Sequence, residues 1–229
     1  MHAVRVNGKG AARTAAGHPW IFASDVADTD GAAGGEAVKV IDAAGRPLGT
    51  AHFSSASQIR LRMLSPRVEE IGRGFFLRRI RAAMEYRDRV VRDTDAYRLV
   101  YGEADLLPGL VVDRYGGWLV VQTLDQGMDR AREVILDCLE EVVAPRGVVM
   151  RNDVAVRSRE QLPLEAGVAR GEAPGRVPIR MNGLALEADL VGGQKTGIYL
   201  DQRENYLAVA GYARGRALDC FTSTGGFAL

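Results

Sequence analysis

The chain has 229 residues, 47% of them hydrophobic, and a formal net charge of +1, a composition that suits one large or two modest globular domains. No apolar run approaches the roughly 20 residues that span a bilayer, and the first residues lack the apolar core of a signal peptide, so we expect a cytoplasmic protein. Three scattered histidines offer no metal-ligand spacing, which predicts no metal site.

The small net charge conceals an asymmetry along the chain. Residues 1–92 contain 15 Lys or Arg and 9 Asp or Glu, a net charge of +6, whereas residues 93–229 contain 15 and 20, a net charge of −5. The basic front half indicates a polyanionic partner. Chance clustering of charges on a solvated surface is the alternative interpretation.

The first 68 residues are predicted to form short strands joined by turns. Strand patterns cover residues 37–41, 48–53 and 59–64. In the last of these, apolar residues alternate with Arg60 and Arg62, which predicts a small β-barrel or sandwich with a basic outer face. Ahead of the strands, Trp20 is expected to cap the small core rather than stack on a base, and His18 is a candidate phosphate contact.

An arginine-rich helix is predicted over residues 71–92, where apolar residues recur at helical spacing. Arginines occupy positions 73, 78, 79, 81, 87, 89 and 92. Only Glu85 and Asp88 could pair with them within the second half of the helix. We therefore expect the excess charge to contact phosphate groups, although a solvated face is the alternative.

A compact α+β region is predicted to follow. Residues 110–115 and 118–124 flank the hairpin turn Gly116-Gly117, and residues 128–143 form a helix that leads to a strand at 147–150. Residues 158–174 are polar and contain Gly and Pro, which indicates a loop. A second hairpin is expected at Asn182-Gly183, a strong signal for a two-residue turn.

The last quarter combines two glycine loops, a helix and a strand. Asp201 and Glu204 have the spacing of a capping box at a helix start. Apolar residues run into Asp219 and then Gly225-Gly226, which predicts a strand whose carboxyl end meets a ligand-binding turn. A P-loop interpretation of GGQKTG fails, because Gln194 stands where that motif requires glycine.

Three sequence blocks carry a resemblance to a known family: GEADLLPGLVVDRYGG (102–117), GGQKTGIYLDQRENY (192–206) and LDCFTSTGGFAL (218–229). The chain resembles the class I S-adenosylmethionine-dependent ribosomal RNA methyltransferases that make 5-methylcytosine in large-subunit RNA. The resemblance implies an α+β multi-domain fold. It consists of a PUA-like RNA-binding barrel (1–68), a basic helix with a central α+β domain (69–183), and the incomplete beginning of a Rossmann-like domain (184–229).

The resemblance also implies the functional residues. The expected contacts with S-adenosylmethionine are Lys195, Tyr199, Asp201, Gln202, Arg203, Asp219, Phe221, Thr222, Gly225 and Gly226. The expected contacts with ribosomal RNA are Lys9, Arg13, His18, Arg60, Arg62, Arg78 and Arg81. Arg203 suits the methionine carboxylate by bidentate pairing. A tyrosine is more usual in the family where Ser223 stands, and a homodimer is a further implication.

We expect the catalytic residues to lie beyond Leu229, so that this polypeptide alone is inactive. A parallel strand needs neighbours on its edges and helices on its faces, and the domain that begins near residue 184 lacks both. Cys138 and Cys220 are expected to be buried packing residues without a disulfide. Two other hypotheses remain: a non-catalytic PUA-type RNA-binding protein, and a methyltransferase that acts on another nucleobase or on a protein.

Overall fold

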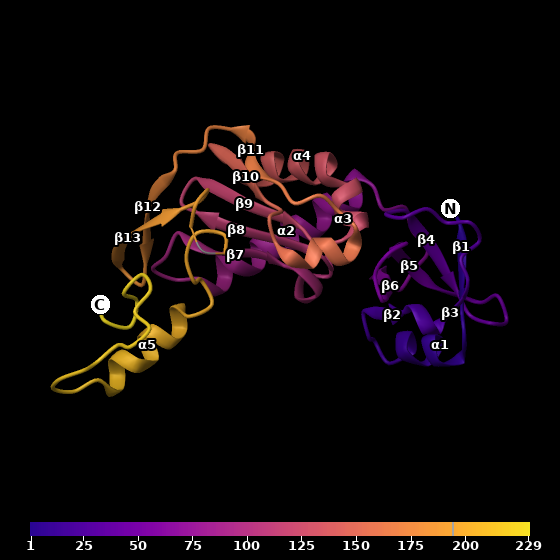
Figure 1. Ribbon diagram of the computed structural model, residues 1–229, viewed down its shortest axis with the longest axis horizontal. Coiled ribbons are helices and arrows are strands. Elements are labelled where there is room, and N and C mark those ends of the chain that lie inside the picture. The colour runs from indigo at the N-terminus through magenta and orange to yellow at the C-terminus, as the bar shows by residue number, and fades with distance from the viewer. Residues whose placement is uncertain (194) are drawn as a thin grey trace.

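The computed structural model describes residues 1–193 and 195–229, which form an elongated molecule with a six-stranded sheet at one end (Figure 1). A five-stranded sheet occupies the middle, a two-stranded hairpin packs beside it, and helix α5 extends from the other end. Within these residues, no helix is both long enough and apolar enough to cross a membrane.

The N-terminal domain is built on a six-stranded sheet. Its strands are β1 (Ala3–Val6), β2 (Trp20–Phe22), β3 (Val26–Asp28), β4 (Ala37–Ile41), β5 (Pro47–Phe53) and β6 (Ile59–Ser65), in the order β2-β6-β5-β4-β1-β3. Helix α1 (Gly8–Ala15) begins at Asn7, whose side chain accepts from the N–H of Gly10 at 2.9 Å. A 3-10 turn η1 (Ala23–Asp25) follows β2. The three predicted strands are confirmed.

The central domain is a five-stranded sheet covered by helices on one face. Its strands are β7 (Ala96–Tyr101), β8 (Leu110–Tyr115), β9 (Trp118–Thr123), β10 (Gly147–Arg151) and β11 (Ala166–Gly171), in the order β11-β10-β9-β8-β7. Its helices are α2 (Arg73–Val90), α3 (Gln126–Arg130) and α4 (Arg132–Val143), with 3-10 turns η2 (Gly102–Asp105) and η3 (Ala155–Glu160). Apolar residues of α2 and α4 pack against this sheet in one continuous core.

The opposite face of the central sheet is covered by the hairpin β12 (Arg176–Met181) and β13 (Leu184–Asp189). Its turn residues Asn182 and Gly183 both have positive φ, 53° and 79°, as the predicted two-residue turn requires. The predicted domain boundary between residues 183 and 184 falls inside this turn, and residues of both strands share one core with Tyr115 and Val120 of the central sheet.

Two predicted elements of the central domain differ from the structure. The predicted helix 128–143 is divided at Ala131, where ψ of 4° ends α3 before α4 begins. The predicted loop 158–174 contains η3 and β11, and β11 pairs with β10. Strand β11 reads AGVARG, with few β-branched or aromatic residues, so its pairing is decided by the neighbouring strand rather than by its own composition.

Helix α5 (Arg203–Tyr212) is the last regular element of the described chain. The prediction of a strand that ends at Asp219 is wrong, since Leu218 and Phe221 lie in irregular chain and are 87% and 93% exposed. A single parallel strand has no partner among the described strands and therefore does not form. Cys220 is exposed rather than buried, whereas Cys138 is buried as predicted, and both thiols are free.

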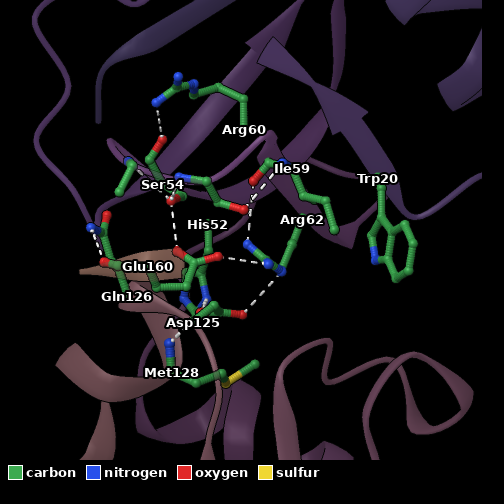
Figure 2. A network of polar contacts seen from close by, with 12 residues as sticks. Trp20, His52, Ser54, Ile59, Arg60, Arg62, Asp125, Gln126, Met128 and Glu160 are labelled. Carbon is green, nitrogen blue, oxygen red and sulfur yellow. Dashed lines mark hydrogen bonds and ion pairs between the residues drawn. The ribbon is translucent and has the colours of Figure 1, made fainter. Parts of the chain in front are cut away.

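A buried polar network joins the N-terminal and central domains (Figure 2). Arg62 on β6 donates from Nη2 to Glu160 Oε1 at 2.7 Å, and its Nε lies 3.5 Å from Asp125 Oδ2. Ser54 donates to the other oxygen of Glu160 at 2.6 Å. The prediction that Arg62 lies on a basic outer face is therefore wrong, because the central domain covers that face of β6.

Burial sets the protonation of two groups in this network. Desolvation, followed by the charge of Arg62, lowers the pKa of His52 to about 3, so its imidazole is neutral at 3.9 Å from Asp125. Desolvation raises the pKa of Asp125 to about 6, although Arg62 opposes this shift. The contact between His52 and Asp125 is therefore not an ion pair at neutral pH.

Candidate functional site

The loop after β13 is fixed to the central sheet by a chain of buried hydrogen bonds. Thr196 donates to Asp113 Oδ2 at 2.6 Å and lies 3.0 Å from the hydroxyl of Tyr115. The N–H of Ile198 donates to the same hydroxyl at 3.4 Å. Arg98 closes the chain with two hydrogen bonds to Asp113, at 2.8 and 3.0 Å. The loop and the sheet are thus joined by one network of hydrogen bonds in which these polar groups all have partners.

The direction of these hydrogen bonds follows from the protons available. Thr196 has a single hydroxyl proton and gives it to Asp113, so the Tyr115 hydroxyl must donate to Thr196. Burial, and then the charge of Asp113, raises the pKa of Tyr115 to about 12, which keeps this phenol protonated. This arrangement of hydrogen bonds therefore requires a protonated, neutral Tyr115.

Arg151 holds the same loop from another position. Its Nη1 donates to the carbonyl oxygens of Gly193 at 3.1 Å and Leu190 at 3.4 Å. Its Nε pairs with Asp153 at 3.0 Å. Side chains of β8 and β10 thus hold the main chain of the loop, which fixes the position from which the following residues continue.

The predicted residues Lys195, Tyr199 and Asp201 lie together on the loop. Lys195 Nζ is 4.1 Å from the centre of the Tyr199 ring and 3.8 Å from Asp201 Oδ1. Lys195 and Asp201 line a pocket of about 440 Å³ that is also bounded by Arg98 and Tyr101 of β7. The loop therefore forms one wall of a pocket whose other wall belongs to the central domain.

The start of α5 differs from the predicted capping box. The helix begins at Arg203, its N-cap is Gln202 without a side-chain cap, and Asp201 lies one residue before that cap. Asp201 pairs with Lys195 instead and therefore does not cap the helix. The Gln202 side chain accepts from Asn205 at 2.9 Å.

The second glycine loop folds back onto α5. Tyr206 meets Phe227 edge to face with 4.6 Å between ring centres. Gly226 lies under the Tyr206 ring, where a Cβ atom would overlap it, and Gly225 has φ of +82°. Thr222 donates to the main-chain oxygen of Asp219 at 2.9 Å. The predicted residue Phe221 is 93% exposed and lines a pocket of about 810 Å³ with Asp219 and Gly226.

Two of the predicted cofactor residues carry buried polar atoms without a partner among the described residues. These atoms are Nη1 of Arg203 and Oδ2 of Asp219. The pKa of Tyr206 is raised by burial first and then by the negative charges of Asp201 and Asp219. The other ends of both side chains have partners, since Arg203 Nη2 pairs with Glu204 at 2.7 Å and Asp219 Oδ1 accepts from the N–H of Phe221 at 3.2 Å. The remaining guanidinium N–H and carboxylate oxygen match the carboxylate and ammonium groups of a methionine moiety in type.

Apart from the buried Arg62, the N-terminal candidates for RNA contact are at least partly exposed. Lys9 and Arg13 of α1 flank the buried Asp25, with Nζ at 4.0 Å and Nε at 3.4 Å from its oxygens. His18 accepts from the N–H of Trp20 at 3.0 Å and lines a pocket of about 230 Å³. Trp20 is half-buried and donates to Glu103 at 2.6 Å, which ties it to the central domain.

The expectation that the arginines of α2 lack partners is wrong. Arg78 pairs with Glu69 at 2.7 Å, and Arg81 pairs with Glu141 at 2.6 Å. Their partners come from the preceding loop and from α4, which the helix sequence alone does not reveal. Arg60 on β6 donates to the main chain of Ser54 at 2.7 Å. Arg78 and Arg81 are exposed and Arg60 is half-buried, whereas Arg62 is buried.

Sequence reasoning missed the central-domain wall of the pocket. Arg98 and Tyr101 belong to β7, a strand that was not predicted. The available signal was their position just before GEADLLPG, one of the three blocks that carry the family resemblance. Thr196 was also missed, although it lies between two predicted residues of the loop.

The chain matches known proteins over most of its length. Residues 4–66 match the family described as a PUA-like domain. The "Ribosomal RNA large subunit methyltransferase I" of Erwinia tasmaniensis is 43% identical over 93% of this chain and 55% of its own length. The protein of the same name from Citrobacter koseri is 40% identical over the same shares. The chain thus spans about half the length of the curated relatives it matches.

Solved structures share the fold. A structure described as a SAM-dependent methyltransferase from Streptococcus mutans has a TM-score of 0.82 and 23% identity, covering all of this chain and 59% of that one. Another, described as a methyltransferase complexed with SAH, has a TM-score of 0.83 and 22% identity with the same coverage. The predicted α+β multi-domain fold with a PUA-like N-terminal domain is confirmed.

Proposed function

We propose that this chain, a homologue of ribosomal RNA large subunit methyltransferase I proteins over 93% of its length, supplies the RNA-binding and methyl-donor-contacting parts of a related enzyme. The donor is S-adenosylmethionine, and the acceptor is large-subunit ribosomal RNA, at C5 of a cytosine. The reaction takes place in the cytoplasm, where that RNA resides.

The observation that carries this proposal is the pair of unpartnered buried atoms on Arg203 and Asp219. A buried polar atom without a partner costs stability. The free N–H of Arg203, and the free oxygen of Asp219 in the pocket that it lines with Tyr206 and Phe227, therefore favour a ligand with complementary groups. The Arg203 guanidinium would hold the methionine carboxylate, and Asp219 would accept from its ammonium group. The bound donor supplies an electrophilic methyl group, and these side chains orient it.

The RNA part of the proposal rests on the exposed cations of the N-terminal domain and α2. Lys9, Arg13 and Arg60 lie on the domain that matches the PUA-like family, and Arg78 and Arg81 lie on α2. The ion pairs of Arg78 with Glu69 and of Arg81 with Glu141 lie on the surface, and exposed pairs are weak, so phosphate groups can compete for these arginines. Arg62 is omitted from this set because it is buried.

We also propose that the 229-residue polypeptide alone transfers no methyl group. Methylation at cytosine C5 by this chemistry needs a thiolate that attacks C6 of an extruded base. Cys138 is buried in the central core, and burial raises the pKa of its thiol. Cys220 lies on the exposed tail, and neither cysteine lines the Lys195 pocket. Methyl transfer to ribosomal RNA by the purified polypeptide would contradict this point.

Calorimetry with S-adenosylmethionine and SAH tests the donor site. We expect the polypeptide to bind both, and Arg203→Ala and Asp219→Asn to weaken binding by about tenfold or more, the value of a charged hydrogen bond. Arg216→Ala, at an exposed position of the same segment, is the matched control. RNA binding without any donor binding would instead favour a non-catalytic PUA-type RNA-binding protein.

A further inference from the structure

An aromatic platform stands at the end of β7. Tyr101 is 57% exposed, and the guanidinium carbon of Arg98 lies 5.1 Å from the centre of its ring. Arg98 is held by Asp113 through two hydrogen bonds. Because Asp113 is fully buried and also accepts from Thr196, Arg98 is fixed in place, and Tyr101 is accompanied by a positioned cation.

The facing wall of the pocket comes from the loop described above. Lys195 and Asp201 provide polar groups, and Ile198 and Leu200 provide an apolar surface. The enclosed volume of about 440 Å³ lies within the range of small-ligand sites. The pair between Lys195 and Asp201, at 3.8 Å and half-exposed, is weak enough for an incoming anion to displace.

We propose that this pocket holds one nucleotide of single-stranded RNA, with its base stacked on Tyr101 and its phosphate close to Arg98 and Lys195. The inference rests on the proposed function, since it locates the acceptor strand beside the donor loop. Exposed aromatic rings bind bases by stacking, and arginine beside the ring adds cation–π attraction. The donor suits the pocket less well, because it carries a positive sulfonium group and no phosphate.

The same segment leads from this pocket toward the N-terminal domain. Tyr101 lines the nucleotide pocket, and Leu106, five residues later, lines the second pocket together with His18 and Arg79. Leu106 is 53% exposed and has φ of 57°, a conformation that a leucine rarely adopts. Strained, exposed residues concentrate at functional sites. An RNA strand that leaves Tyr101 along η2 would therefore reach His18 and Arg79.

Fluorescence anisotropy with a labelled single-stranded oligocytidine RNA of roughly 12 nucleotides tests the platform. We expect Tyr101→Ala to weaken binding at least about tenfold, and Tyr101→Phe to stay within about twofold, because the ring alone stacks. Tyr86→Ala is the matched control. Tyr86 is 52% exposed and has Arg87 at 5.3 Å from its ring, yet it lines neither this pocket nor the one at His18.

Crosslinking of a 5-iodocytidine form of the same RNA to the unmutated chain provides a second measurement that does not depend on the variants folding. A crosslinked peptide that contains Tyr101 supports the proposal. Equal affinity of Tyr101→Ala and the unmutated chain would overturn it while leaving the proposed function intact. Displacement of the RNA by saturating SAH would also overturn it, since the pocket would then hold the donor. Failure of the unmutated chain to bind RNA would contradict both this inference and the RNA part of the proposed function.

Discussion

At the scale of single residues, a charge pattern does not reveal which side chains meet solvent. Arg60 and Arg62 alternate on β6 and look equivalent in the sequence. Arg60 is half-buried, whereas Arg62 is 8% exposed between two carboxylates of the central domain. Alternation predicts correctly that the two side chains share a face. It cannot predict that another domain covers part of that face, because this depends on residues about 60 to 100 positions later.

Arg62→Leu should lower the free energy of unfolding by about 3–5 kcal/mol, because Glu160 and Asp125 would remain buried without their cation. Chemical denaturation measures the change. Arg78→Ala is the control, since Arg78 pairs with Glu69 on the surface and should contribute about 0–1 kcal/mol. Similar losses in the two variants would contradict the buried role of Arg62.

His52 should make the fold sensitive to acid. Its folded-state pKa of about 3 lies below the ordinary value of 6.5, so its contribution to stability is present above about pH 6.5 and lost as the pH falls toward 3. Asp125 acts in the opposite sense, since its folded pKa of about 6 exceeds the ordinary 3.8. Its contribution is present below about pH 4 and lost as the pH rises through 6.

The variant His52→Gln separates the two groups, because glutamine does not titrate. Lowering the pH from about 7.5 to about 5 should reduce the unfolding free energy of the unmutated chain by about 2 kcal/mol more than that of this variant. Denaturation at both pH values measures this shift. A difference that does not change with pH would show that His52 titrates normally in the folded state.

At the scale of elements, the sequence predicts what local chemistry determines. Alternating β-branched residues and the Asn182-Gly183 turn locate most strands and both hairpins correctly. Strand β11, with its sequence AGVARG, has little preference of its own and forms because β10 offers a free edge. The strand expected at Asp219 has no partner among the described strands, so it does not form. For the candidate site, the loop residues were predicted, while their anchors on β7 and β8 depend on tertiary contacts.

Thr196→Val should release the loop from the central sheet. Valine keeps the shape of the side chain but cannot donate to Asp113 or accept from Tyr115, which leaves two buried polar groups without this partner. Hydrogen exchange should become faster at Ile198, whose N–H bonds to Tyr115. Thr196→Ser keeps the hydroxyl and should exchange nearly as the unmutated chain does. Unchanged exchange in Thr196→Val would show that Arg151 alone holds the loop.

At the scale of the whole molecule, the docking of the N-terminal domain depends on close approach as well as on charge. Gly127 on α3 packs directly against the His52 ring of β5, and a Cβ atom there would overlap the ring. Gln126, one residue earlier, bonds to Ser55 and to the main chain of Glu160. Helix α3 therefore adds both a polar contact, through Gln126 (Figure 2), and a steric contact, through Gly127, to the Arg62 network between the domains. Since this fit fixes where His18 lies relative to η2, it also fixes the proposed RNA path.

Gly127→Ala should separate the two domains without altering either core. A Cβ atom on Gly127 would overlap the buried His52 ring, so the added methyl group must displace that ring or push β5 away from α3. We expect a loss of about 1–3 kcal/mol in the stability of the N-terminal domain and a larger radius of gyration by small-angle scattering. Gly74→Ala is the matched control, because a Cβ atom on Gly74 in α2 meets nothing within 4 Å and should stabilise the helix by up to about 1 kcal/mol. An unchanged radius of gyration and stability in Gly127→Ala would show that the domains are held together by the Arg62 network rather than by this contact.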